Sequence, residues 1–355
     1  MLRCFHSNTP QLWGAILLAF AVGLTGCSSG NQATNQTQTE TRAASTTASK
    51  GKPKVIASYS VVCDLTESIA ADSVDLTCLV DPEADPHTYQ ATPADRKAIE
   101  TAQLILYGGY DFEPTIVNLV QATKNSAPKL AVNEQAVPKP LMGEAHEHEG
   151  EEHAHESGEA EHESGEMAAD PHVWHDAENG IRMVEVIRNQ LQKVAPEHQE
   201  LYERNAQQLS DELKQVDTWI QAQINTIPPQ QRKLVTTHDA LGYYANAYGL
   251  KIEGTLQGFS TEEQPTAARL RELVKEVKST NVPTIFAEVT ANDKVIRTVA
   301  REAGVKIADQ QLYADGLGAE GSWAGTYAGM LTSNTCVIAS GLGGKCTPFA
   351  AKSNS

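Results

Sequence analysis

The sequence lacks clusters of lysine and arginine, although its 355 residues are enough for two domains of ordinary size. The formal net charge is −17. Residues 144–166 hold ten glutamates and no basic residue, so subtracting this segment leaves only −7 for the rest of the chain. Neutralising the phosphates of a nucleic acid needs clustered basic side chains. The composition therefore disfavours a nucleic-acid-binding role.

The sequence also lacks an apolar run of the length that a transmembrane helix needs. The run at 12–24 (LWGAILLAFAVGL) has 13 residues and follows Arg3, a pattern typical of the apolar core of a signal peptide. It ends in LTGC, which resembles the bacterial lipoprotein box, in which cleavage leaves Cys27 lipidated at the new N-terminus. An ordinary cleaved secretory signal is the alternative. We expect a signal peptide over 1–26 and a flexible polar tether over 27–53.

Closely spaced cysteine pairs are absent as well. Setting aside Cys4 in the signal and Cys27 leaves four of the six cysteines, which are Cys63, Cys78, Cys336 and Cys346. An even number in an exported chain suggests disulfides, with three possible pairings. We favour the sequence-local pairing of the first with the second and of the third with the fourth. A cysteine zinc site is disfavoured because neither pair has the C-x₂₋₄-C spacing.

From residue 54 onward, short β-rich runs alternate with helical patterns. Strands are expected at 54–60, 74–80, 104–109 and 129–132, with helices between them. Thr92, Pro93 and Asp95 have the spacing of a capped helix start. This alternation predicts a parallel sheet covered by helices, forming an N-terminal lobe over 54–195.

A long, mostly polar helical stretch at 196–228 ends at a Pro-Pro pair and carries a narrow apolar stripe, made of Leu201, Leu209, Leu213, Val216 and Ile220. We interpret it as a rigid helix that joins two lobes rather than as a core helix. Residues 229–355 repeat the strand–helix alternation and predict a second α/β lobe. The expected fold is therefore α/β, with two lobes of mostly parallel sheet and a ligand site between them, beyond the carboxyl ends of the strands.

Histidines and carboxylates occur where such a site would lie. His87 and His172 both follow an Asp-Pro pair, so two separate loops present a histidine on a similarly restricted backbone. On its own, His87 would be interpreted as a surface residue. The repeated Asp-Pro-His motif favours a ligand instead. His238 directly follows a strand, Glu288 ends another, and Asp315 lies in the glycine-flanked LYADGLG loop. Three imidazoles and a carboxylate suit Zn²⁺, whereas Mn²⁺ favours more carboxylate oxygens.

The segment 143–168 has no periodic apolar face and is expected to be a disordered loop. Its histidines are His146, His148, His153, His155 and His162. At this density of His and Glu, we expect weak binding of divalent cations in many geometries; the alternative is a solvated charge run with no role. Glu288 and His175 are interpreted as supporting residues of the site, with His175 alternatively part of a loop, and His198 as a residue without a role at the site.

Six motifs in this order resemble a known family: the lipoprotein signal, DPHTYQATP, the His-rich insert, DPHVW, THDALGYYANAYGL with TIFAEVTAND, and LYADGLG. Together they resemble the zinc/manganese-type solute-binding proteins of metal ABC transporters, over essentially all of the mature chain. The resemblance implies two lobes joined by one long rigid helix and metal ligands at His87, His172 and His238. It implies that Asp315 is the fourth ligand or a near neighbour of it. Members of the manganese type usually have Glu where this chain has His238, so the resemblance favours the zinc members.

The resemblance further implies a monomeric protein, lipid-anchored at the outer face of the cytoplasmic membrane, that delivers Zn²⁺ to a membrane permease. His175-Asp176 and the cysteine placement depart from the family pattern. Three other readings stay open: a zinc hydrolase with Glu288 as base, although no HExxH occurs; a manganese- or iron-binding protein of the same class; and an adhesin or zinc buffer without a transporter.

Deleting residues 144–166 should leave one tight zinc site intact, because the four candidate ligands lie outside this segment. Calorimetric zinc titration of the full chain and the deletion variant measures this. Loss of the tight site on deletion, together with tight binding by His238→Ala, would reverse the assignment.

Overall fold

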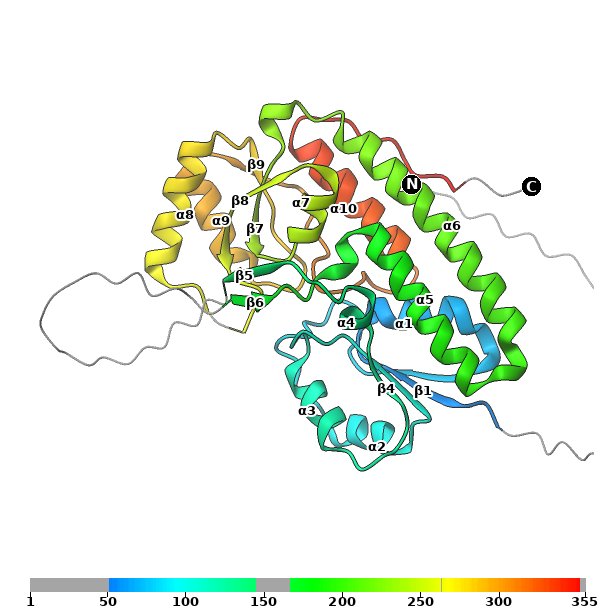
Figure 1. Ribbon diagram of the computed structural model, residues 1–355. Coiled ribbons are helices and arrows are strands. Elements are labelled where there is room, and N and C mark those ends of the chain that lie inside the picture. Colours follow the sequence, from blue (N-terminus) through cyan, green and yellow to red (C-terminus); the bar gives the residue numbers. More distant parts are fainter. Residues whose placement is uncertain (1–50, 145–166, 263, 352–355) are drawn as a thin grey trace, which may run out of the picture. The chain divides into compact units, whose positions relative to one another are not determined.

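A computed structural model describes residues 51–144, 167–262 and 264–351. The predicted signal peptide, Cys27, almost all of the predicted tether and the five histidines of the His-rich segment lie outside the described residues. The first lobe holds a four-stranded parallel sheet in the order β2-β1-β3-β4 (Figure 1). Its strands are β1 Lys54–Ala57, β2 Asp75–Cys78, β3 Leu104–Tyr107 and β4 Lys129–Ala131.

Helices connect these parallel strands, as crossover connections require. They are α1 Ser60–Ala70, α2 Pro93–Thr101, α3 Pro114–Ala122 and the short α4 Val132–Ala136 after β4. The start of α2 is a full capping box: the Thr92 side chain accepts from the Asp95 backbone N–H, and the Asp95 carboxylate accepts from the Thr92 backbone N–H. The predicted helix start is confirmed.

The second lobe repeats this plan. β7 Lys233–His238 pairs in parallel with β8 Lys251–Gln257, and β9 Thr284–Ile285 pairs in parallel with β10 Lys306–Ile307. The Phe286 N–H donates to the Val235 carbonyl at 2.9 Å and places β9 beside β7. The strands therefore lie in the order second, first, third, fourth in both lobes. The helices are α7 Gly242–Tyr248, α8 Ala267–Thr280, α9 Asp293–Ala303 and α10 Tyr327–Gly341. The predicted α/β class with two lobes is confirmed.

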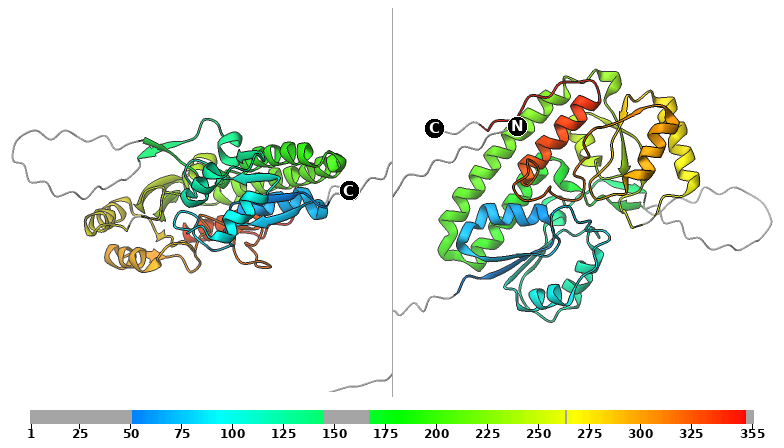
Figure 2. Two further views of the ribbon diagram at one scale, coloured as in Figure 1. Left: turned by 90° about the horizontal axis from the view of Figure 1, so that it is seen from below. Right: turned by 180° about the vertical axis from the view of Figure 1, so that it is seen from behind.

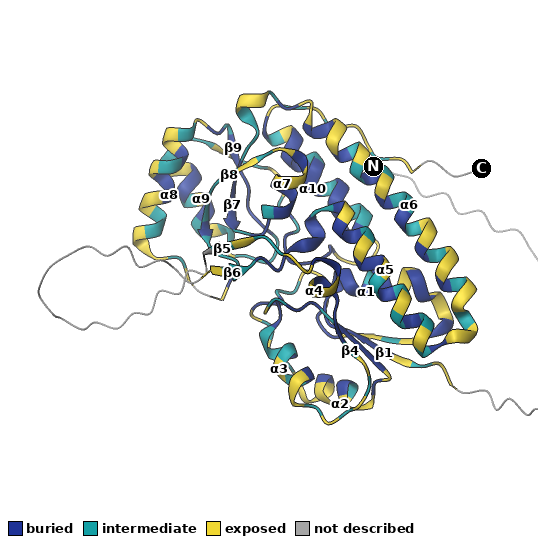
Figure 3. Ribbon diagram, viewed as in Figure 1, coloured by how far each residue is buried: buried dark blue, intermediate teal, exposed yellow. Residues whose placement is uncertain are grey.

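The predicted long helix is α6, Gln199–Ile224, which follows α5 (Ala177–Val194) and a single 3₁₀ turn at Pro196–His198. Its 26 residues span about 39 Å. One face is buried and the other is exposed (Figure 3). Its neighbours are α5, α1 and α10, so it contacts helices from both ends of the chain (Figures 1 and 2). The sequence predicts a helix that joins two lobes rather than a core helix. The structure shows that α6 joins the two halves and also packs against each.

The borders of the His-rich segment differ from expectation. Met142–Glu144 (β5) and Met167–Ala169 (β6) form an antiparallel pair, so positions 143, 144, 167 and 168 belong to a hairpin stem and not to a disordered loop. Gly143 makes this possible, because the Phe259 ring packs against it where a Cβ would lie. No apolar periodicity signals so short a pair of strands.

The structure joins Cys63 to Cys78 and Cys336 to Cys346, which is the sequence-local pairing. The Cα atoms are 5.9 Å and 5.1 Å apart, within the usual range. Within the described ranges, no helix has the length and apolar character needed to cross a membrane.

Candidate metal centre

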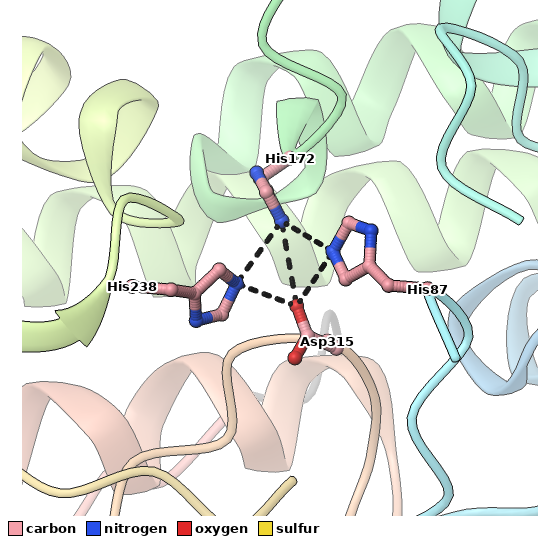
Figure 4. A group of neighbouring side chains, drawn as sticks. All are labelled: His87, His172, His238 and Asp315. Atoms are coloured by element: carbon pink, nitrogen blue, oxygen red, sulfur yellow. Dashed lines mark hydrogen bonds and ion pairs between the residues drawn. The ribbon is translucent and has the colours of Figure 1, made fainter. Parts of the chain in front are cut away.

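Four side chains from separate segments converge in one cluster: His238 ends β7, and His87, His172 and Asp315 lie outside the strands (Figure 4). The His87 Nε2 lies 3.3 Å from the His172 Nε2, which lies 3.4 Å from the His238 Nε2. Asp315 Oδ1 is 3.0 Å, 3.4 Å and 3.5 Å from the Nε2 atoms of His238, His172 and His87. All four residues are buried. Every residue that the sequence suggested as a ligand therefore lies in one cluster.

Repeated local chemistry presents the two first-lobe histidines. The Asp85 Oδ1 accepts the backbone N–H of His87 at 3.0 Å, and the Asp170 Oδ1 accepts that of His172 at 2.9 Å. This is the side-chain-to-backbone turn that Asp favours two residues before its donor. The repeated Asp-Pro-His motif thus has a structural reason: Asp closes the turn and Pro restricts it.

Carboxylates orient two of the three imidazoles. The His172 Nδ1 lies 2.8 Å from the Asp170 Oδ1, and the His238 Nδ1 lies 2.5 Å from the Glu288 Oε2. A proton held on Nδ1 by a carboxylate leaves the Nε2 lone pair facing the centre of the cluster, as is common for histidines at metal sites. The His87 ring packs edge-on against Phe112, with centroids 4.9 Å apart.

Glu288 is fully engaged in holding His238. Its other oxygen accepts the backbone N–H groups of Thr237 at 3.0 Å and His238 at 3.2 Å. The carboxylate is fully buried and oriented by these contacts. It is therefore a positioning residue, and the hydrolase reading loses the base on which it depended.

A fully buried glutamate occupies the matching place in the first lobe. Glu113 accepts hydrogen bonds from the Ser58 hydroxyl at 2.7 Å and the Gly108 N–H at 2.6 Å, beyond the ends of the first and third strands. Burial is the main cause that raises the pKa of Glu113 to about 7. The two lobes thus share this carboxylate as well as their strand order, but only Glu288 contacts a candidate ligand.

Asp315 is also held on its far side. The Thr290 hydroxyl donates to the Asp315 Oδ2 at 2.6 Å, which leaves Oδ1 toward the three imidazoles. His175 supports the same loop, because its Nε2 donates to the Ala314 carbonyl at 2.7 Å. Burial lowers the pKa of His175 to about 3, so the ring is neutral. His175 supports the cluster without joining it, and His198 lies elsewhere, beside Tyr202.

Two of the candidate ligands favour protons when no cation is bound. Burial opposes a charge on His238, but Asp315 and Glu288 outweigh it and raise its pKa well above the ordinary value. Burial is likewise outweighed at His172, where hydrogen bonds to Asp170 and Asp315 raise the pKa. Burial lowers the pKa of His87. Burial alone would raise the pKa of Asp315, yet the neighbouring histidines hold this pKa well below the usual range.

A cavity of about 870 Å³ opens beside the cluster and has His87 in its wall. The hairpin strand β6, the loop after β8 and the start of α8 line the rest.

Comparison with known proteins agrees with this geometry. Residues 55–341 match the family described as the periplasmic component A of a zinc-uptake complex. The chain belongs to this family. Its members are solute-binding components of metal transporters, and it is not a family of enzymes. The predicted resemblance is confirmed.

Individual relatives carry names for two different metals. The chain is 32% identical to the manganese-binding lipoprotein MntA of Bacillus subtilis, over 93% of this chain and 98% of the relative. It is 30% identical to the manganese ABC transporter substrate-binding lipoprotein PsaA of Streptococcus pneumoniae, over 93% and 98%. The structure of the periplasmic zinc-binding protein TroA of Treponema pallidum superimposes with a TM-score of 0.72 at 29% identity, over 82% of this chain and 99% of that one.

Sequence reasoning missed Asp170, Thr290 and Phe112 at this site. Asp170 is the first residue of the Asp-Pro-His motif that contains His172, and the same motif begins at Asp85. This repetition is a signal by which the sequence could have identified Asp170. Thr290 and Phe112 carry no such signal, because their positions next to Asp315 and His87 arise only from the tertiary fold.

Replacing Glu288 by Gln should weaken metal binding by about 10- to 100-fold, because the amide removes the charge that orients His238 and favours its Nδ1–H tautomer. Isothermal titration gives the affinity. Glu253→Gln is the matched control, since this glutamate of β8 pairs with Lys233 and Lys251 away from the cluster. If Glu288→Gln and the parent protein bind the metal with equal affinity, Glu288 does not position His238 for binding.

Proposed function

We propose that this chain is the extracytoplasmic zinc-binding component of a metal ABC importer, which captures Zn²⁺ and delivers it to a membrane permease. His87, His172 and His238 bind the ion through Nε2, and Asp315 supplies the fourth ligand through Oδ1. The observation that carries the proposal is the convergence of these three nitrogens and one oxygen in a buried cluster, in which His172, His238 and Asp315 are hydrogen-bonded from behind. Zn²⁺ is the transported cargo.

The donor set favours zinc. Ligands at about 2.0–2.2 Å from a tetrahedral ion lie about 3.3–3.6 Å from one another. Five of the six distances in the cluster are 3.0–3.5 Å, and all four atoms lie within 4.8 Å of one another. Three imidazoles and a single carboxylate match Zn²⁺ better than Mn²⁺, which prefers oxygen ligands. Manganese is the second candidate, because the relatives MntA and PsaA are named for it.

Delivery follows from how the site is built. The lipid on Cys27 and the polar tether hold the two lobes near the membrane, where a monomer meets the permease. The metal site lies between an N-terminal lobe over 54–195 and a C-terminal lobe over 229–355, with 196–228 as the link. Because α6 packs against helices from both ends of the chain, release depends on movement of the ligand loops with only a modest shift of the lobes.

The metal itself provides the first test. The purified chain, stripped of metal with a chelator, should bind one equivalent of Zn²⁺ tightly, and a large excess of Mn²⁺ should fail to displace it. Deletion of the gene should abolish high-affinity zinc uptake. The parent gene should restore this uptake, and the His238→Ala variant should not. Displacement of zinc by stoichiometric Mn²⁺ would assign the chain to the manganese class instead.

Zinc affinity should fall as pH is lowered, and the fall should begin above pH 6.5. Zn²⁺ needs neutral imidazoles, and the raised pKa values of His172 and His238 mean that protons compete with the ion above the ordinary histidine range. Binding should also release protons. Titrations at pH 5.5 to 8.5 in buffers of different ionisation enthalpy measure both effects, and a flat affinity across this range contradicts the expectation.

A further inference from the structure

Segment 108–113 leaves the end of β3 on a strained backbone. Gly109, Tyr110 and Asp111 have φ values of +87°, +52° and +57°, so three successive residues lie in the left-handed region. Glycine adopts this region readily, whereas other residues keep it only where the surrounding structure holds them in it. The conformation of this segment therefore depends on the contacts that hold it.

Contacts of Tyr110 hold the middle of the segment. Its N–H donates to the Glu134 Oε1 at 2.9 Å, and its hydroxyl donates to the Val137 carbonyl at 2.6 Å. The Phe112 N–H closes the turn on the Gly109 carbonyl at 3.2 Å. The two ends of the segment are held by a different group.

The Glu113 side chain ties these two ends together. Its Oε1 accepts the N–H of Gly108 at 2.6 Å and the hydroxyl of Ser58, which lies just beyond the end of β1, at 2.7 Å. Its Oε2 is buried and has no hydrogen-bond partner in the described part of the chain. Burial makes a negative charge costly here and raises the pKa of Glu113 to about 7. The contacts therefore require a hydrogen-bond acceptor at the Oε1 position and do not require a charge.

The residue before Glu113 contacts two candidate ligands. The buried Phe112 ring meets the His87 ring edge-on with centroids 4.9 Å apart, and it meets the His172 ring edge-on at 5.7 Å. Unlike the other two imidazoles, His87 has no carboxylate that accepts a hydrogen bond from its Nδ1 among the residues that the structure describes. The direction of the His87 ring therefore relies on the placement of Phe112 by segment 108–113.

The same segment is tied to the backbone of the second of these ligands. The Asn133 N–H donates to the Gly108 carbonyl at 3.0 Å, and the Asn133 side-chain amide donates to the Pro171 carbonyl at 3.2 Å. Asn133 is fully buried, and Pro171 directly precedes His172. A shift of Gly108 is therefore transmitted through Asn133 to the backbone that presents His172.

We infer that Glu113 is a positioning residue of the metal site, which sets zinc affinity by holding segment 108–113 against the two first-lobe ligands, His87 and His172. The inference rests on the proposed function, because it concerns how tightly that site holds zinc. Glu113 acts on the two ligands through Phe112 and Asn133.

Glu113 and Glu288 position ligands in different ways. A charged oxygen of Glu288 contacts the His238 ring directly, whereas Glu113 acts through the hydrogen bonds of one oxygen. Glu113→Gln keeps an acceptor at the Oε1 position, and its amide nitrogen replaces the Oε2 that makes no hydrogen bond. In Glu288→Gln, one of two engaged oxygens is lost. Replacing the carboxylate by an amide should therefore affect the two positions differently.

Zinc titrations of purified, metal-stripped variants of the full chain test the inference. Glu113→Ala should weaken zinc binding by about tenfold, because segment 108–113 loses its acceptor and releases Phe112. Glu113→Gln should bind zinc as the parent does, whereas Glu288→Gln should not. The unfolding temperature of each metal-free variant is measured alongside. A purely structural role of Glu113 would lower that temperature and leave the zinc affinity of the folded molecules unchanged.

Glu100→Ala is the matched control, because this exposed glutamate of α2 pairs with Arg96 and its removal should leave zinc affinity unchanged. Parent-like affinity of Glu113→Ala overturns the inference, and so does a loss for Glu113→Gln as large as that for Glu113→Ala. If Glu113→Ala does not fold, Phe112→Leu takes its place and should weaken zinc binding; parent-like affinity of this variant then overturns the inference. If the parent chain binds Mn²⁺ in place of Zn²⁺, the proposed function fails first, and the same variants titrated with Mn²⁺ decide the positioning role.

Discussion

Contacts behind the candidate ligands are the constraint on which the site depends: hydrogen bonds hold three of them, and an aromatic ring packs against His87. Three buried imidazoles and a carboxylate can point in many ways, and a cation between them needs four lone pairs directed at one place. Asp170 and Glu288 turn two rings, Thr290 turns Asp315, and Phe112 supports the third ring. The same contacts tie the protonation of the histidines to their carboxylates, so a cation and protons compete for one cluster.

The fold supplies these contacts from parallel strand ends. Each lobe places its strands in the order second, first, third, fourth, so the ends of the first and third strands lie side by side. In both lobes a glutamate fills the space beyond them: Glu113 holds a serine hydroxyl, and Glu288 holds His238. One architecture used twice thus carries a carboxylate that holds a serine in one half and a carboxylate that positions a candidate ligand in the other.

Much of this could be read from the sequence, and the reasons are local. Some features depend only on residues close together in the chain, so they can be recognised in the sequence. These are the Asp-Pro-His repeat, the capping box at Thr92 and the strand–helix alternation. Two candidate ligands, His87 and His172, were found through this repeat, and His238 was found because it follows a strand pattern. Thr290, Phe112 and the Gly143–Phe259 contact could not be found, since each depends on segments that meet only in space. The packing of α6 was underestimated for the same reason: its stripe is narrow, but Tyr202, Ala206 and Ser210 widen the buried face.

The packing of α6 against α1, α5 and α10 has a thermodynamic meaning for the cargo cycle. A binding protein that opens widely spends part of its time in forms that cannot hold the ion, and its apparent affinity is reduced by that fraction. A stiff connection keeps nearly every molecule competent, which suits scavenging from dilute surroundings. The same stiffness means that spontaneous unloading is slow, so extraction has to be driven by whatever receives the ion.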